Sequence, residues 1–285
     1  MTSSTAAISV RGLRKSYAGR EVVAGIDLEV FTGEIFAILG PNGAGKTTTV
    51  EILEGYRERD SGDVRVLEED PAHPRSGERA WRNRIGIVLQ SVNDAGDLTV
   101  SETVHHFSHY YTAAKDPDAV IGLVGLTDKA SAKVATLSGG QRRRLDVALG
   151  IIGSPEILFL DEPTTGFDPE ARRAFWELIR TLRDEGTTIL LTTHYLDEAE
   201  ALADRVAVIN KGRVIEIATP ELLGGRAEAS ATISWSENGV PQSAQSKNPT
   251  EFVLQLSARL GGEIADLRVS RPSLEDIYLR MIGEA

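Results

Sequence analysis

The segment GPNGAGKT, residues 40–47, fits the pattern G-x-x-x-x-G-K-[ST], which is typical of loops that bind nucleotide phosphates. Glycines let the backbone wrap closely around a phosphate, and the N-terminus of the following helix attracts an anion. Lys46 can reach the β- and γ-phosphates, the Thr47 hydroxyl can ligand Mg²⁺, and Thr48 can help hold the α/β-phosphate side. An ordinary Gly-rich turn is the alternative, but the apolar strand and the helix that flank the segment argue against it.

The run ILFLDE, residues 157–162, delivers two carboxylates at the end of an apolar strand. Ligands of open α/β sheets bind at the carboxyl ends of the strands. Asp161 suits the coordination shell of Mg²⁺, and Glu162 can polarise a water that attacks the γ-phosphate. For this run alone a solvated acidic turn is the better explanation, but not in a chain that also carries the phosphate loop.

The sequence LSGGQRRR, residues 137–144, predicts a helix that opens with a Ser and two glycines. Such an N-terminus is a second anion site, well separated in the chain from Lys46. Two phosphate sites suggest that two chains share one nucleotide, with Ser138 and Gly140 coming from the opposite subunit. A plain Ser cap is the alternative, but it explains neither the paired glycines nor three Arg where the helix dipole disfavours cations.

The elements that must position these residues follow an α/β pattern. Short strands are predicted at residues 7–13, 13–19 and 21–30, and further strands at 34–40, 63–67, 85–90, 157–161, 187–194, 205–210 and 212–217. Helices are predicted at 46–53, 169–183 and 196–203, and only helices between about 98 and 152. After residue 225 we expect a strand at 231–235, a loop over the polar stretch 236–250 and a helix at 251–260.

In type and order these motifs resemble the ATP-binding subunit of ABC transporters, in which LSGGQ is the signature motif and residues 40–47 and 157–162 are Walker A and Walker B. The resemblance implies an α/β P-loop NTPase fold of the ABC ATPase type, a RecA-like core with an antiparallel β subdomain and a helical insert. It implies that residues 1–223 form the nucleotide-binding domain, with a helical signature subdomain at about 91–153. Residues 224–285 would be a small α+β extension.

The same resemblance assigns further residues. Gln90 matches the Q-loop glutamine, which touches Mg²⁺ and the water and senses the transmembrane partner. Asp168 lies in the D-loop, His194 matches the switch histidine that contacts the γ-phosphate, and Tyr17 fits the aromatic that stacks on adenine. The remaining nucleotide contacts implied by the Walker A and signature motifs are Asn42, Gly43, Gly45, Gly139 and Gln141.

The implied function is that of an ATP-hydrolysing motor subunit that uses ATP and Mg²⁺. Two copies, or this chain and a paralogous subunit, would close around two ATP and drive a separate membrane permease. The end of the chain, PSLEDIYLRMIG, resembles the ATPases of daunorubicin-resistance type exporters, which implies export of a drug, antibiotic or lipid-like substrate. The sequence does not identify that substrate, because the permease holds the substrate path.

Composition limits the alternatives. The chain has 285 residues with 31 Lys plus Arg and 42 Asp plus Glu, and its net charge of −11 argues against general electrostatic binding of nucleic acid. It has no Cys, which excludes disulfides and Cys-ligated metals. No apolar run approaches the roughly 20 residues that span a bilayer, and the start MTSSTAA predicts no signal peptide. Taken with these features, the family resemblance implies a peripheral bacterial protein at the cytoplasmic face of the cell membrane.

Three other classes share parts of the pattern. A chromosome or nucleic-acid ATPase with this head would be split by a long coiled coil, and no sustained heptads occur. A ribosome-acting factor would carry two fused cassettes, whereas this chain has one phosphate loop and one LSGGQ. A regulatory cassette without hydrolysis would lack the base or the histidine, yet Glu162 and His194 are both present.

Overall fold

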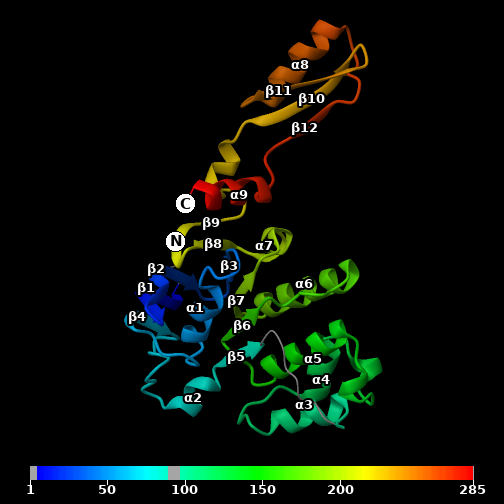
Figure 1. Ribbon diagram of the computed structural model, residues 1–285. Coiled ribbons are helices and arrows are strands. Elements are labelled where there is room, and N and C mark those ends of the chain that lie inside the picture. The colour runs from blue at the N-terminus through cyan, green and yellow to red at the C-terminus, as the bar shows by residue number, and fades with distance from the viewer. Residues whose placement is uncertain (1–4, 89–96, 285) are drawn as a thin grey trace. The chain divides into compact units, whose positions relative to one another are not determined.

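The computed structural model describes residues 5–88 and 97–284 (Figure 1). The chain divides into two compact units, Met1–Ile217 and Ala218–Ala285. Among the described residues, none of the helices has the length and apolar character that crossing a membrane requires.

A six-stranded sheet forms the centre of the first unit, in the order β5-β6-β7-β3-β8-β9. The strands are β3 (Ile35–Leu39), β5 (Ile85–Val88), β6 (Ile157–Asp161), β7 (Thr188–Thr193), β8 (Arg205–Asn210) and β9 (Arg213–Ala218). From β5 to β8 along this order, neighbouring strands run parallel. The central strands β3, β6 and β7 are buried along almost their whole length, as strands covered on both faces must be.

Parallel pairing brings the carboxyl ends of these strands to one edge of the sheet. Leu39 pairs with Thr193, and Asp161 pairs with Thr192. The phosphate loop, Glu162 and His194 each follow directly after one of these strand ends. The register therefore places all three candidate regions at the same edge.

A second sheet, antiparallel, packs against this core. Its strands β1 (Ala6–Tyr17), β2 (Arg20–Phe31) and β4 (Ser61–Val66) lie in the order β2-β1-β4. The prediction of two short strands before residue 20 was wrong, because β1 continues through Gly12. There the pairing register with β2 shifts between Val10 and Leu13, and Gly12 has φ 59°, so a bulge absorbs the irregularity.

The helices fall into two groups. On the core lie α1 (Lys46–Leu53), the short α2 (Glu78–Arg82), α6 (Pro169–Asp184) and α7 (Leu196–Leu202). The helical insert contains α3 (Val100–Ser108), α4 (Pro117–Leu123) and α5 (Gly139–Ile151), which pack together (Figure 1). Two 3₁₀ turns, Thr127–Lys129 and Val134–Thr136, connect α4 to α5. Within described residues 97–152 no strand forms, as predicted.

The second unit begins with a 3₁₀ segment, η3 (Leu223–Glu228), and contains one three-stranded sheet. Its elements are β10 (Ala231–Glu237), β11 (Val240–Ser246), α8 (Pro249–Leu260), β12 (Arg268–Ser270) and α9 (Leu274–Glu284). The predicted loop over residues 236–250 was wrong, because Val240–Ser246 is a strand paired with β10. Asn238 and Gly239 both have positive φ and form the two-residue turn that hairpins favour, so a mostly polar edge strand can pair with β10.

Candidate functional site

The phosphate loop joins β3 to α1, and its glycines are required by close contacts. A Cβ on Gly40 would lie 2.4 Å from the carbonyl oxygen of Ile209, and one on Gly45 would lie 2.6 Å from that of Val22. Gly45 also has φ 101° and caps α1. The loop thus packs closely against β8 and β2, and only glycine fits at these two positions.

Lys46 begins α1 and is 5% exposed. Its Nζ donates hydrogen bonds to the carbonyl oxygens of Gly40, at 2.8 Å, and Pro41, at 3.3 Å. Burial lowers the pKa of Lys46, while the charges of Glu162 and Asp161 act in the opposite direction. The ammonium is therefore held inside the loop beside two acidic groups, with carbonyl acceptors that phosphate oxygens can replace.

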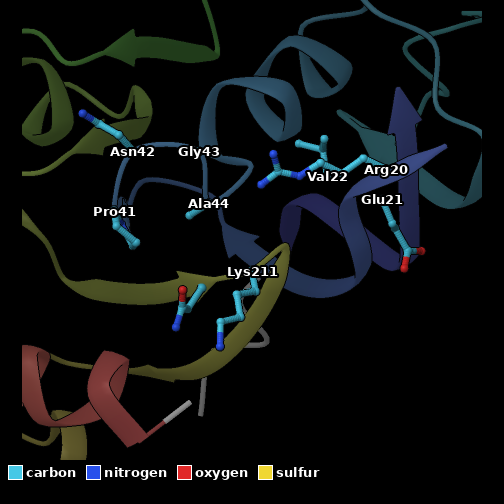
Figure 2. A pocket seen from close by; sticks show the side chains of 9 residues that line it. Arg20, Glu21, Val22, Pro41, Asn42, Gly43, Ala44 and Lys211 are labelled. Carbon is cyan, nitrogen blue, oxygen red and sulfur yellow. The ribbon is translucent and has the colours of Figure 1, made fainter. Parts of the chain in front are cut away.

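A hollow of about 500 Å³ lies beside this loop (Figure 2). Figure 2 shows Pro41–Ala44 on one side of the hollow and the start of β2 with Arg20 on another, and Lys211 also lines it. The turn after β8 braces the loop, because the Gly212 N–H donates to the Ala44 carbonyl at 3.0 Å. Sequence reasoning missed this turn, which no local pattern connects to the phosphate loop.

The end of β6 carries the second candidate pair. The Thr192 hydroxyl donates to Oδ1 of Asp161, and the Glu162 N–H donates to the Thr192 carbonyl at 3.1 Å. Glu162 has φ 43°, the left-handed region that non-glycine residues seldom adopt. His194 Nδ1 lies 3.3 Å from Oε1 of Glu162, so the predicted base and the predicted switch histidine are in contact.

The described residues fit a Mg²⁺ ion that depends on phosphate oxygens for most of its ligands. In residues 5–88 and 97–284, no three His, Asp or Glu side chains gather in a way that would hold a metal by themselves. Among the described residues, the carboxylate of Asp161 at the sheet edge and the exposed Thr47 hydroxyl can supply oxygen ligands to Mg²⁺. One or two protein oxygens together with phosphates is the usual Mg²⁺ site of nucleotide-hydrolysing enzymes.

The signature segment lies at the N-terminus of α5. Ser138 caps the helix in a capping box, with the Gln141 N–H donating to its hydroxyl at 3.3 Å and the Gln141 side chain accepting from the Ser138 N–H. Ser138 and Gly139 are exposed, and Gly140 is half-buried. The Ser cap proposed as the plain alternative is therefore present, on a helix end that remains open to an anion.

The structure places three further residues that the family resemblance assigned, Asp168, Tyr17 and Gln90, in different situations. Asp168 caps α6 by accepting from the Ala171 N–H at 2.8 Å, so it has a structural role in addition to any contact across two chains. Tyr17 is 37% exposed, with the cations of Lys15 and Arg57 over its ring at 5.6 and 5.4 Å from the ring centroid. Gln90 lies outside the described residues, two positions beyond the end of β5.

A buried polar cluster next to the site also escaped sequence reasoning. Glu198 in α7 is completely buried, and neither of its carboxylate oxygens has a hydrogen-bond partner in the described part of the chain. The Thr164 hydroxyl and the Trp176 indole N–H face this carboxylate and lower its pKa, although neither makes a hydrogen bond of 3.5 Å or less. The available signal was the spacing, because Glu198 shares the apolar face of α7 with Leu202 four residues later.

Replacing Glu198 with Gln is expected to stabilise the protein at high pH. Burial raises the pKa of Glu198 above its usual value of 4.5, against smaller opposing effects of Thr193, Thr164, Trp176 and Arg172. The folded state then keeps a proton that the unfolded chain has lost, so stability falls as pH rises from about 4.5 through the folded pKa. Gln removes this loss, and each kcal/mol regained raises the melting temperature by about 2–4 °C.

Melting temperatures of the wild type and Glu198→Gln at several pH values from about 4.5 upward test this expectation. The gap between the two proteins should widen as pH rises. A variant that melts below the wild type at every pH would show that an ionised Glu198 is needed in the fold.

Comparisons with known proteins agree with this geometry. The ABC transporter family model matches residues 23–165. Over 98% of both chains, the sequence is 39% identical to the Nod factor export ATP-binding protein I of Burkholderia orbicola (strain AU 1054). It is 37% identical to the daunorubicin/doxorubicin resistance ATP-binding protein DrrA of Streptomyces peucetius, over 99% of this chain and 94% of that one.

Solved structures are similar to the same part of the chain. The cbiO1 subunit of the Clostridium perfringens cbiONQ ABC transporter complex superposes with a TM-score of 0.69 at 29% identity, covering 76% of this chain and 89% of that one. An ATP-binding subunit of another ABC transporter gives a TM-score of 0.68 at 25% identity, covering 77% of this chain and 92% of that one.

Proposed function

Because the chain belongs to the ABC transporter family of ATP-binding proteins, we propose that it is the ATP-hydrolysing subunit that drives a separate membrane permease in substrate export. The observation that carries the proposal is the edge of the parallel sheet. There the phosphate loop with Lys46 follows β3, Glu162 follows β6, and His194 lies 3.3 Å from Glu162. The register of the parallel strands therefore brings the proposed phosphate-binding loop, the proposed base and the proposed switch histidine to the same edge of the sheet.

In this mechanism the chain acts mainly by positioning and electrostatics. A water attacks the γ-phosphorus, the bond to the bridging oxygen breaks, and ADP and phosphate are released. The Glu162 carboxylate takes the proton of the water, and His194 holds that carboxylate and supports the γ-phosphate. Lys46 neutralises the phosphate charge, assisted by the first-turn amides of α1 and by Asn42, Gly43 and Thr48.

Mg²⁺ would be held by Asp161 and Thr47, with Gln90 as a further contact. The ion, when bound, neutralises the charge that develops on the phosphates. Tyr17 would stack on adenine at the end of the β1–β2 hairpin, where it pairs with Arg20, a lining residue of the hollow.

We propose further that two ATP-binding chains close on each other, each supplying its signature segment to the nucleotide of the other. The exposed α5 N-terminus, with Ser138, Gly139, Gly140 and Gln141, supports this arrangement. Asp168 would contact the opposite chain at the same junction. A homodimer and a pair with a paralogous subunit both satisfy this geometry.

A groove of about 730 Å³ supports the choice of a separate permease as partner. Its lining combines apolar side chains, such as Ile87 of β5 and Phe107 of the helical insert, with charged ones such as Arg82 and Asp146. Glu54 also lines the groove; it is 5% exposed and has no hydrogen-bond or ion-pair partner for its carboxylate among the described residues. Burial, Asp161 and Glu51 raise the pKa of Glu54 to about 8. A permease segment that inserts a cation beside Glu54 would stabilise the ionised carboxylate.

The two relatives named above are described as acting in Nod factor export and in daunorubicin/doxorubicin resistance. This supports an exported drug, antibiotic or lipid-like molecule as the substrate, and a peripheral position of this chain at the cytoplasmic face of a bacterial membrane. Residues 224–285 would be an extension of the nucleotide-binding domain.

Co-expression with the cognate permease tests the proposal. Cells with both proteins should accumulate less daunorubicin or less of a labelled lipid-like probe than cells with either protein alone. The pair with Lys46→Ala in this subunit is the matched control and should accumulate as much as cells without the permease. Resistance conferred by this subunit in the absence of the permease would contradict the motor function.

A further inference from the structure

A buried arginine in the signature helix reaches the catalytic edge of its own chain. Arg143 lies in the first turns of α5, five residues after Ser138, and is 6% exposed. It is one of three consecutive Arg, of which Arg142 and Arg144 are half-buried. A fully desolvated guanidinium is costly unless its donors are satisfied, so its position calls for specific acceptors.

Those acceptors flank Glu162. The Nε of Arg143 donates to the carbonyl oxygen of Pro163 at 3.1 Å, and its Nη2 donates to that of Asp161 at 2.8 Å. The two carbonyls belong to the residues immediately before and after Glu162. One planar guanidinium therefore spans the residue that carries the proposed base.

Glu162 needs such support because its backbone is strained. Its φ of 43° is a left-handed conformation, and a non-glycine residue keeps it only where the surroundings impose it. From β7, Thr192 accepts the Glu162 N–H through its carbonyl at 3.1 Å. From α5, Arg143 binds the two flanking carbonyls. The backbone of Glu162 is thus fixed from both sides, and the direction of its side chain with it.

We propose that Arg143 is a positioning residue that aims Glu162 at the attacking water and links it to the signature helix of the same chain. The inference rests on the proposed function, in which Glu162 is the base and Ser138 contacts the nucleotide of the other chain. Because Arg143 and Ser138 share α5, a shift of this helix when the partner's ATP arrives moves the anchor of the chain's own base. The base of each chain is then correctly placed only when the signature helix α5 of that chain is bound to the nucleotide of the other chain.

The first test separates positioning from binding. Arg143→Met removes both donors at similar volume, so kcat for ATP hydrolysis should fall by about ten- to a hundredfold, less than the roughly 10²–10⁴-fold that general-base catalysis contributes, because the base itself is still present. KM and the dissociation constant for ATP should stay within about twofold, because the phosphate loop is unchanged. Arg143→Lys keeps the charge without the planar fork and should lose less activity. Arg180→Met, which removes an arginine near the end of α6 that binds the Ala201 carbonyl, is the control and should keep full kcat.

Melting temperatures show whether a variant is folded, and Arg143→Lys provides the comparison if Arg143→Met melts early. Wild-type kcat in a folded Arg143→Met protein would overturn the proposal. So would a loss of kcat that is matched by an equal loss of ATP affinity, because it would indicate a general disturbance of the nucleotide site.

The second test shows whether Arg143 positions the base of its own chain or the base of the partner chain. Arg143→Met chains mixed with Glu162→Gln chains before ATP is added should show no rescue, because each chain carries a defective base of its own. If Arg143 instead acted on the partner's site, each mixed dimer would contain one intact site, and a one-to-one mixture, in which about half of the dimers are mixed, would regain about a quarter of the wild-type rate; this result would overturn the proposal. Glu162→Gln by itself tests the proposed function separately from the role of Arg143. Full activity in that variant would refute the assignment of Glu162 as the base.

Discussion

Lys46→Ala is expected to abolish ATP binding at concentrations that saturate the wild type. The ammonium is the main positive charge of the phosphate loop, and it is buried beside the carbonyls of Gly40 and Pro41, where solvent screens it little. Removing one partner of a buried charged contact typically costs about 2–5 kcal/mol. That cost corresponds to a loss of affinity of about thirtyfold to several thousandfold.

Calorimetric titration of each protein with ATP and Mg²⁺ measures this loss. Lys115→Ala is a suitable control, because it removes an equal charge from a surface pair with Glu185. Wild-type affinity in Lys46→Ala would refute the phosphate-loop assignment, whereas a similar loss in both variants would point to an effect of net charge alone.

The sequence predicted the parts of this site that local physics dictates. An apolar run before a Gly-rich loop predicts a buried strand and an anion-binding helix start, and β3 and α1 follow that pattern. The run ILFLDE in the same way predicted a buried strand that ends at Asp161, which is β6. Family motifs assigned His194 to the γ-phosphate and Glu162 to the water but predicted no contact between the two, and the structure places them 3.3 Å apart.

What the sequence could not predict depends on contacts between distant segments. Arg143 belongs to a run of three similar residues, and only the packing of α5 selects it to bind the carbonyls around Glu162. Glu198 looks like any acidic residue of an exposed helix until α6 covers it. The strand β11 has no apolar alternation because most of its side chains are exposed and only Ala244 packs against the small core, so the Asn238-Gly239 turn was the only local sign of the hairpin.

Glu162→Gln is expected to lower the rate of ATP hydrolysis by two or more orders of magnitude while leaving ATP binding intact. Gln keeps the size of the side chain and accepts a hydrogen bond from His194, but it cannot take a proton from water. Glu156→Gln is a matched control, because Glu156 precedes the same strand at its other end and is an exposed partner of Arg84. A wild-type rate in Glu162→Gln would show that another group is the base.

The same variant tests how two chains share the nucleotides. If ATP joins the chains and hydrolysis releases them, the wild-type dimer is short-lived, and Glu162→Gln should accumulate as a dimer in saturating ATP. Light scattering would then report twice the chain mass of 30.8 kDa. Adding Ser138→Arg places bulk on the exposed end of α5 and should return the protein to a monomer that still binds ATP through Lys46. A dimer that persists with Ser138→Arg would place the contact between the chains elsewhere, and the signature segment would then have no part in closing the site.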